Sequence, residues 1–211
     1  MANYLNLENP YNPLLWNRDD VTSRHRAVIN TVWELPVGKG KRFLVGAPRP
    51  VDVVLGGWKI AWTSILQTGQ FFSPSFSGSD PSNTNTSGGR PDRVCNGNLA
   101  SDQRALNRWF DTSCFVAPPA GRFGNAGVNI LESPGLQTHN ASFTKRFRLT
   151  ERIALDYMAT VSNIFNHPNF LAPASNVSRA RTGGVITSQH GRFGADRSGA
   201  RFIDMRLRVE F

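Results

Sequence analysis

The last eleven residues of the chain, 201–211, alternate between apolar and polar side chains and end on an aromatic residue. Successive side chains of a β-strand point to opposite faces, so this pattern predicts a strand with one apolar and one charged face. The apolar positions are Ile203, Met205, Leu207, Val209 and Phe211, and the charged positions are Asp204, Arg206, Arg208 and Glu210. A soluble sandwich would turn the apolar face toward its core, whereas a transmembrane barrel turns it toward lipid and the charged face toward a wet lumen.

Four further segments have strand-like alternation, at about residues 23–35, 57–72, 140–149 and 152–165. In the fourth of these, Asp156 lies on the polar face, opposite Leu155 and Tyr157. Helical periodicity is confined to a short turn around residues 102–109. The chain is therefore predicted to be all-β.

The connections between these segments alternate in length. Only Thr150 and Glu151 separate the third and fourth segments. About 67 residues separate the second and third, and about 35 the fourth and fifth, although compact soluble domains rarely carry structureless loops beyond about 15 residues. Outer-membrane barrels have short periplasmic turns and long extracellular loops. We therefore expect an antiparallel, up-and-down transmembrane barrel segment of about five strands, with long extracellular loops at 73–137 and 166–201 and an irregular loop at 1–19.

The first long loop is rich in Gly, Ser, Asn and Pro and contains both cysteines, Cys95 and Cys114. In a bacterial envelope these thiols would face an oxidising compartment, where they could form one loop-closing disulfide. In a cytosolic protein, two such cysteines would more commonly remain free thiols. The disulfide is thus expected on the barrel interpretation.

The chain has a formal net charge of +9, which makes nucleic acid or another acidic surface a candidate partner. The arginines, however, lie on polar strand faces and in turns, which favours a solvated face over a nucleic-acid site. Several aromatic residues lie near expected strand ends, where a barrel places its interfacial girdle. They are Trp33, Trp58, Phe71, Phe72, Phe165 and Phe170. We therefore expect no nucleic-acid partner.

Residue patterns that carry catalytic chemistry are missing from the sequence. The four histidines are dispersed, and neither cysteine lies near a second ligand at zinc spacing. Residues 121–127 superficially resemble a Gly-rich phosphate loop, but neither a buried strand nor a helix flanks them, and they are interpreted as a surface loop. We expect no enzyme activity and no catalytic, cofactor or metal site.

Neither a transmembrane helix nor a leader is expected from the sequence. No stretch approaches 18 consecutive apolar residues. Residues 1–10 have neither a basic start nor an apolar core, so no signal peptide is expected. For an exported barrel, this suggests that Met1 is not the start of the complete protein.

Five segments of the chain have a characteristic sequence. They are 24–43, which contains Glu34-Leu-Pro-Val-Gly-Lys-Gly-Lys-Arg42, then Leu55-Gly-Gly-Trp-Lys-Ile60, Gln67-Thr-Gly-Gln-Phe-Phe72, Phe147-Arg-Leu-Thr-Glu-Arg-Ile153 and Ser162-Asn-Ile-Phe-Asn-His-Pro-Asn-Phe170. In this order and spacing they resemble TonB-dependent outer-membrane receptors, in the subgroup with a carboxypeptidase-regulatory-like N-terminal domain. The resemblance covers about residues 20–211.

The resemblance implies a barrel of about 22 strands around an N-terminal plug, with import driven by the inner-membrane TonB complex. It also implies that the C-terminal strand is the signal read by the barrel-assembly machinery, through Ile203, Met205, Leu207, Val209 and Phe211. Five strands cannot close a barrel, and lipid does not tolerate open sheet edges. We therefore expect the C-terminal piece of a receptor, which needs the remaining strands and the plug and does not transport alone.

The expected function is that of an outer-membrane receptor that takes up a large nutrient, such as a carbohydrate, a peptide or a metal chelate. Lumen-facing charges would hold water and contact the plug, and the TonB complex would act only through that plug. These charges are Asp156, Asp204, Arg206 and Arg208. The alternative is a soluble, basic all-β module that binds nucleic acid or polysaccharide and buries its apolar strand faces in a sandwich core.

Overall fold

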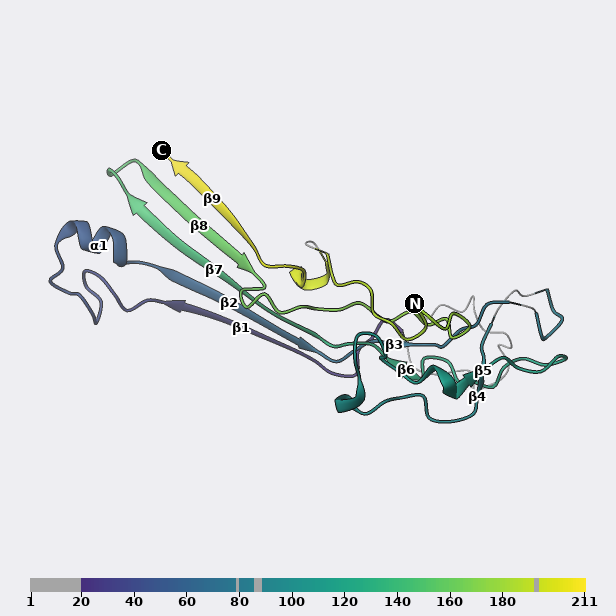
Figure 1. The fold of residues 1–211 in the computed structure, drawn as a ribbon. Helices are drawn as coiled ribbons and strands as arrows, with labels where there is room; N and C mark the ends of the chain where they lie inside the picture. The colour runs from purple at the N-terminus through teal and green to yellow at the C-terminus, as the bar shows by residue number, and fades with distance from the viewer. Residues whose placement is uncertain (1–19, 79, 86–88, 192–193) are drawn as a thin grey trace. The chain divides into compact units, whose positions relative to one another are not determined.

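The computed structural model describes residues 20–78, 80–85, 89–191 and 194–211 (Figure 1). The expected irregular loop at 1–19 lies outside them. The described chain forms two compact units. The sheet unit comprises residues 26–66, 136–169 and 190–211, and the loop unit comprises residues 20–25, 67–135 and 170–189.

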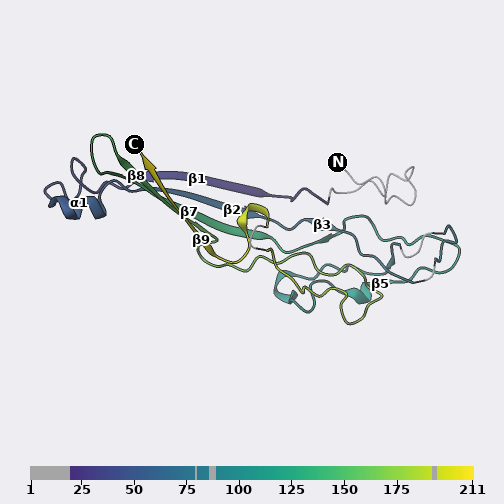
Figure 2. The same cartoon turned by 90° about the horizontal axis from the view of Figure 1, so that it is seen from above.

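The sheet unit is built on one five-stranded sheet in which sequence neighbours are also spatial neighbours. The order is β1 (Arg26–Glu34), β2 (Lys59–Gln67), β7 (Leu136–Arg148), β8 (Ala154–Ser162) and β9 (Phe202–Glu210). The strand arrows alternate in direction in Figure 1, and the sheet twists, as Figure 2 shows. The expected all-β antiparallel architecture is confirmed. In the part of the chain described, the sheet remains open between its edge strands, β1 and β9.

One end of the sheet, which we call the turn end, is where β1, β7 and β9 end and β2 and β8 begin. The β7–β8 turn there is tight, because the Thr150 hydroxyl accepts the main-chain N–H of Ile153 at 3.0 Å. From this turn the pairing runs from Arg148 opposite Ala154 to Ala141 opposite Val161. β8 and β9 then pair over their full lengths. Register is therefore fixed across the three strands at the C-terminal edge.

The expected second strand, 57–72, is shorter in the structure. β2 ends at Gln67, and residues 71–72 form a separate strand, β3, in the loop unit. A Cβ atom on Gly69 would lie 1.7 Å from the Ser133 carbonyl oxygen, so the chain makes a close backbone approach there that only glycine permits. The third strand, by contrast, begins at Leu136 and not near 140.

Helix α1 (Arg49–Leu55) was not expected from the sequence. It lies in the connection between β1 and β2 and begins at a proline in its first turn, where a missing N–H costs nothing. Seven residues are too few to establish a helical period in the sequence. No helix of the described segments has the length and apolar character needed to cross a bilayer.

The loop unit, which contains much of the long loops expected from the sequence, has a hydrophobic core of its own. Its short strands pair antiparallel, β3 (Phe71–Phe72) with β6 (Leu131–Glu132) and β4 (Asp92–Arg93) with β5 (Phe115–Val116). Two 3₁₀ turns, η3 (Ser101–Gln103) and η4 (Thr112–Cys114), lie between β4 and β5. The buried core residues are Phe110, Cys114, Phe115, Ala126 and Leu131.

Two sequence interpretations bear on this core. A disulfide joins Cys95 and Cys114, which is the pairing expected on the barrel interpretation. The surface-loop interpretation of residues 121–127 is wrong in part. Ala126 is completely buried, and its main-chain N–H donates to the Pro91 carbonyl at 3.0 Å. Such long-range packing leaves no local pattern in the sequence.

Candidate functional site

The sheet has one polar face, and it carries all four charged residues expected to face a lumen. Asp156 lies directly opposite Arg208, while Asp204 and Arg206 lie opposite Thr160 and Met158. Even-numbered positions of β8 and β9 therefore share this face. The Arg206 and Asp204 side chains are 4.0 Å apart.

Arg146 and Glu210 join these charges into a network that sequence analysis did not assign to the site. The Arg146 guanidinium lies 2.6 Å from Glu210 and 3.6 Å from Asp156, and Arg208 lies 3.3 Å from Glu210. Glu210 had been placed on a polar strand face, but its contact with Arg146 requires the β7–β8–β9 register. Because the side chains are largely solvent-accessible, each pair stabilises by only about 0.2–1 kcal/mol. The network therefore contributes little to the stability of the fold, and its main effect is to give this face a charged, hydrated surface.

The polar character extends across the rest of the sheet. The Thr63 hydroxyl donates to Asn30 at 2.8 Å, which joins β2 to β1. On β7 and β8, the hydroxyls of Ser142 and Thr160 are 2.9 Å apart. At the turn end, Lys59 on β2 forms an ion pair with the β1 residue Glu34. All five strands therefore contribute hydrogen-bonding groups to the same face.

The opposite face of the sheet is mostly apolar, and it is exposed along the edge strand β9. On β9, Ile203, Met205, Leu207 and Val209 are 54–66% exposed, and they lie opposite Val161, Ala159, Tyr157 and Leu155 of β8. Four of the five residues expected to form the barrel-assembly signal therefore occupy one face of an edge strand, and the fifth, Phe211, follows β9 and is fully exposed. Soluble monomers rarely expose contiguous apolar patches of this kind, whereas a membrane barrel presents them to lipid.

Lys145 is the one charged residue among the strand residues of this apolar face. It lies opposite Tyr157 and is only 5% exposed. Its ammonium group donates to the Val54 carbonyl at 3.1 Å and lies 5.4 Å from the Trp58 ring centroid and 5.0 Å from that of Phe147. A charge shielded by rings and paired with a carbonyl is compatible with an apolar surrounding.

The residues of the expected aromatic girdle lie partly in the sheet unit and partly in the loop unit. Trp33 is exposed near the turn end, and Trp58 packs edge-on against Tyr157 there. Phe165 is exposed after the opposite end of β8 and contacts His139. The girdle interpretation is wrong for two other members, because they belong to the loop unit, where Phe71 is buried and Phe72 packs against Phe110. Phe170 also belongs to the loop unit.

The loop unit contains a buried carboxylate that organises its chain. Asp92 accepts hydrogen bonds from both terminal nitrogens of Arg122 and, at 3.0 Å, from the main-chain N–H of Asn125. The Arg122 guanidinium holds the pKa of the Asp92 carboxyl below its ordinary value, against the opposing effect of burial. This pair fastens the 121–127 segment to β4.

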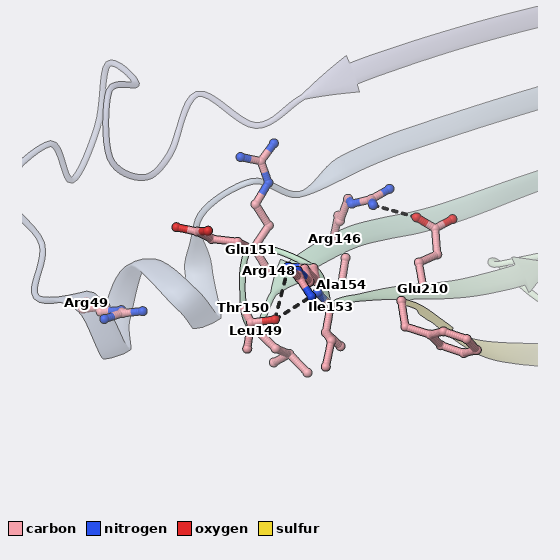
Figure 3. A pocket seen from close by; sticks show the side chains of 11 residues that line it. Arg49, Arg146, Arg148, Leu149, Thr150, Glu151, Ile153, Ala154 and Glu210 are labelled. Atoms are coloured by element: carbon pink, nitrogen blue, oxygen red, sulfur yellow. Dashed lines mark hydrogen bonds and ion pairs between the residues drawn. The ribbon is translucent and has the colours of Figure 1, made fainter.

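A cavity of about 820 Å³ lies at the turn end, around the β7–β8 turn and the C-terminus (Figure 3). Its lining contains four arginines and two glutamates, which gives a modest excess of positive charge; they are Arg49, Arg146, Arg148, Arg152, Glu151 and Glu210. Such a surface can attract anionic groups. Among the described residues, no group of three or more His, Cys, Asp or Glu side chains is arranged to hold a metal ion.

A family model described as an outer membrane beta barrel domain matches residues 2–203. No curated protein and no solved structure matches the chain significantly.

Proposed function

The chain belongs to the outer membrane beta barrel domain family, and on that premise we propose that its sheet is a sector of the barrel of a TonB-dependent receptor. The observation that carries this proposal is the division of the five-stranded sheet into an exposed apolar face and a charged face. The nutrient would be too large for simple diffusion, such as a carbohydrate, a peptide or a metal chelate. The role of the protein would be transport and not catalysis.

Strand length supports a membrane-spanning role. β1, β2, β8 and β9 are each nine residues long. At about 3.3 Å per residue such a strand extends about 30 Å. A tilt of about 45° reduces this to about 21 Å along the membrane normal, close to the apolar band of about 25 Å in outer-membrane barrels.

The open edges of the sheet require partners in lipid. β1 and β9 each have one neighbouring strand in the described structure, and unpaired main-chain groups are not tolerated in the hydrocarbon region. We propose that further strands pair with both edges to close the barrel, and that the assembly machinery reads the apolar face of β9. A plug in contact with the polar-face charges would connect the lumen to the TonB complex.

We propose that the long loops, large parts of which lie in the loop unit, bind the ligand. The hydrophobic core of the loop unit and its disulfide between Cys95 and Cys114 make it a folded body. Folded loops can present a preorganised surface at a lower entropic cost than flexible ones. The soluble-module alternative is not favoured, because a sandwich would bury the apolar residues that β9 exposes.

Uptake by living cells tests the transport role directly. A strain that lacks the gene and its complemented counterpart would be given fluorescent oligosaccharides, oligopeptides and ferric chelates, with and without a protonophore. Energised uptake of one probe class that requires the gene supports a TonB-dependent receptor. Equal uptake in both strains, or gene-dependent uptake that the protonophore leaves unchanged, refutes that role while leaving the membrane placement intact.

A further inference from the structure

The connection between β1 and β2, residues 35–58, exposes an unusual number of large apolar side chains. Seven of them are 38–63% exposed within thirteen consecutive residues. They are Phe43, Leu44, Val45, Val51, Val53, Val54 and Leu55. A connection in water at the turn end of the sheet would gain nothing from this pattern.

The connection has a defined fold, so this exposure is not the result of a loose chain. The Asp52 carboxylate accepts the main-chain N–H of Lys39 at 2.6 Å, and Gly56 closes α1 by donating to the Asp52 carbonyl at 2.8 Å. Gly38, at φ +117, packs so closely that an added Cβ would lie 2.6 Å from the Asp52 carboxylate. These contacts hold the first part of the connection against α1.

The connection is also fastened to the apolar face of the sheet. The Val54 carbonyl accepts two hydrogen bonds, from the Trp58 indole at 2.9 Å and from the Lys145 ammonium at 3.1 Å. Lys145 extends from the apolar face of β7, where it lies opposite Tyr157. It is three residues from the end of β7, about 10 Å along the strand. Lysines and aromatic rings gather at this depth, near a membrane interface.

Basic residues accompany the apolar ones. Lys39, Arg42 and Arg49 are exposed in this connection. Basic and apolar side chains on one short segment are the combination that holds a peptide at an anionic bilayer surface. The apolar residues are moreover attached to the apolar face of the sheet, and an outer-membrane barrel turns such a face toward lipid.

We propose that residues 35–58 form an interfacial anchor that lies in the phospholipid leaflet at the turn end of the barrel. The apolar side chains of the anchor enter the acyl region, and Lys39, Arg42 and Arg49 face anionic headgroups. The anchor rests on the membrane placement of the sheet that the proposed function also uses, but not on TonB-dependent uptake.

Spin labels in native outer membranes test the anchor. Both cysteines of the chain are in the disulfide, so an introduced cysteine is its only free thiol. Labels would be attached to Val45→Cys and Val54→Cys in the anchor, to Leu207→Cys on the apolar face of β9, and to the exposed loop-unit position Leu106→Cys as the aqueous control. Collision with oxygen is then compared with collision with a water-soluble nickel chelate.

The anchor predicts that oxygen exceeds the nickel chelate at positions 45, 54 and 207, and that the order is reversed at 106. If 207 reports lipid but 45 and 54 report water, the anchor is wrong and the membrane placement stands. If 207 also reports water, the membrane placement itself fails. Agreement between 45 and 54 guards against a local effect of either substitution.

Discussion

Replacing Met205 by lysine separates a lipid-facing strand from a soluble one. Met205 is the fourth of the nine residues of β9, lies opposite Ala159 and is 66% exposed. In water, a change at so exposed a site alters stability by no more than about 0.5 kcal/mol. On the lipid face of a barrel, a lysine near the midplane costs about 2–4 kcal/mol. That cost lowers the ratio of assembled to unassembled protein by about 30- to 700-fold.

The measurement is the amount of protease-resistant protein in the outer membrane, together with its heat-dependent mobility on gels. Met158→Lys is the matched control, because Met158 lies on the polar face, opposite Arg206. Like-charge contact with Arg206 costs the control about 0.2–1 kcal/mol, well below the cost at Met205. Equal assembly of the two variants would falsify the assignment of the β9 apolar face to lipid.

Three further variants test other contacts. Cys95→Ser opens a disulfide of sequence separation 19 and should lower the free energy of unfolding of the loop unit by about 3 kcal/mol. Urea unfolding followed by tryptophan fluorescence measures this change. Equal urea midpoints before and after reduction of the native chain would contradict it. Hydrogen bonding to Arg122 lowers the pKa of Asp92 in the folded protein below its ordinary value of 3.8. The Asp92–Arg122 pair therefore stabilises the loop unit above pH 3.8, and this stabilisation is lost as the pH falls through the lowered pKa of the folded state. Asp92→Asn should therefore reduce the loss of stability at acid pH. If the free energy of unfolding depends on acid pH in the same way in this variant, the Asp92–Arg122 pair is excluded as the cause. Lys145→Met removes a charged hydrogen bond to the Val54 carbonyl, worth about 1.5–3 kcal/mol, so limited proteolysis should cut the anchor faster, and an unchanged rate would argue against this attachment.

The sheet was accessible from sequence because its two faces have different surroundings. The alternation at Ile203, Asp204 and Met205 predicts which face of the strand each side chain occupies, and it can be identified without knowing how the strands pair. The charge network was less accessible. The contact between Arg146 and Glu210 joins residues 64 positions apart, and only the pairing of both strands with β8 brings them together.

The loop unit and α1 were missed because long-range contacts define them. Phe110, Ala126 and Leu131 share one buried cluster, yet each lies in a Gly- or Asn-rich segment that resembles an ordinary loop. α1 is short, and its position depends on hydrogen bonds to the Val54 carbonyl from Trp58 and Lys145. Local propensity does not encode either feature, since tertiary contacts supply the stability.

The close approach of the ends of the long β2–β7 connection affects the order in which the chain folds. A Cβ atom on Gly135 would lie 2.6 Å from the Gln67 carbonyl oxygen, so the loop unit, once folded, already holds its two ends together. Closing a flexible loop of about 68 residues carries a length-dependent entropy cost of about 4 kcal/mol. If the loop unit forms first, β2 and β7 can pair as the two strands of a hairpin do, without this entropy cost. Reductant added during synthesis should then delay insertion, whereas reductant added after assembly should leave the inserted sheet unchanged.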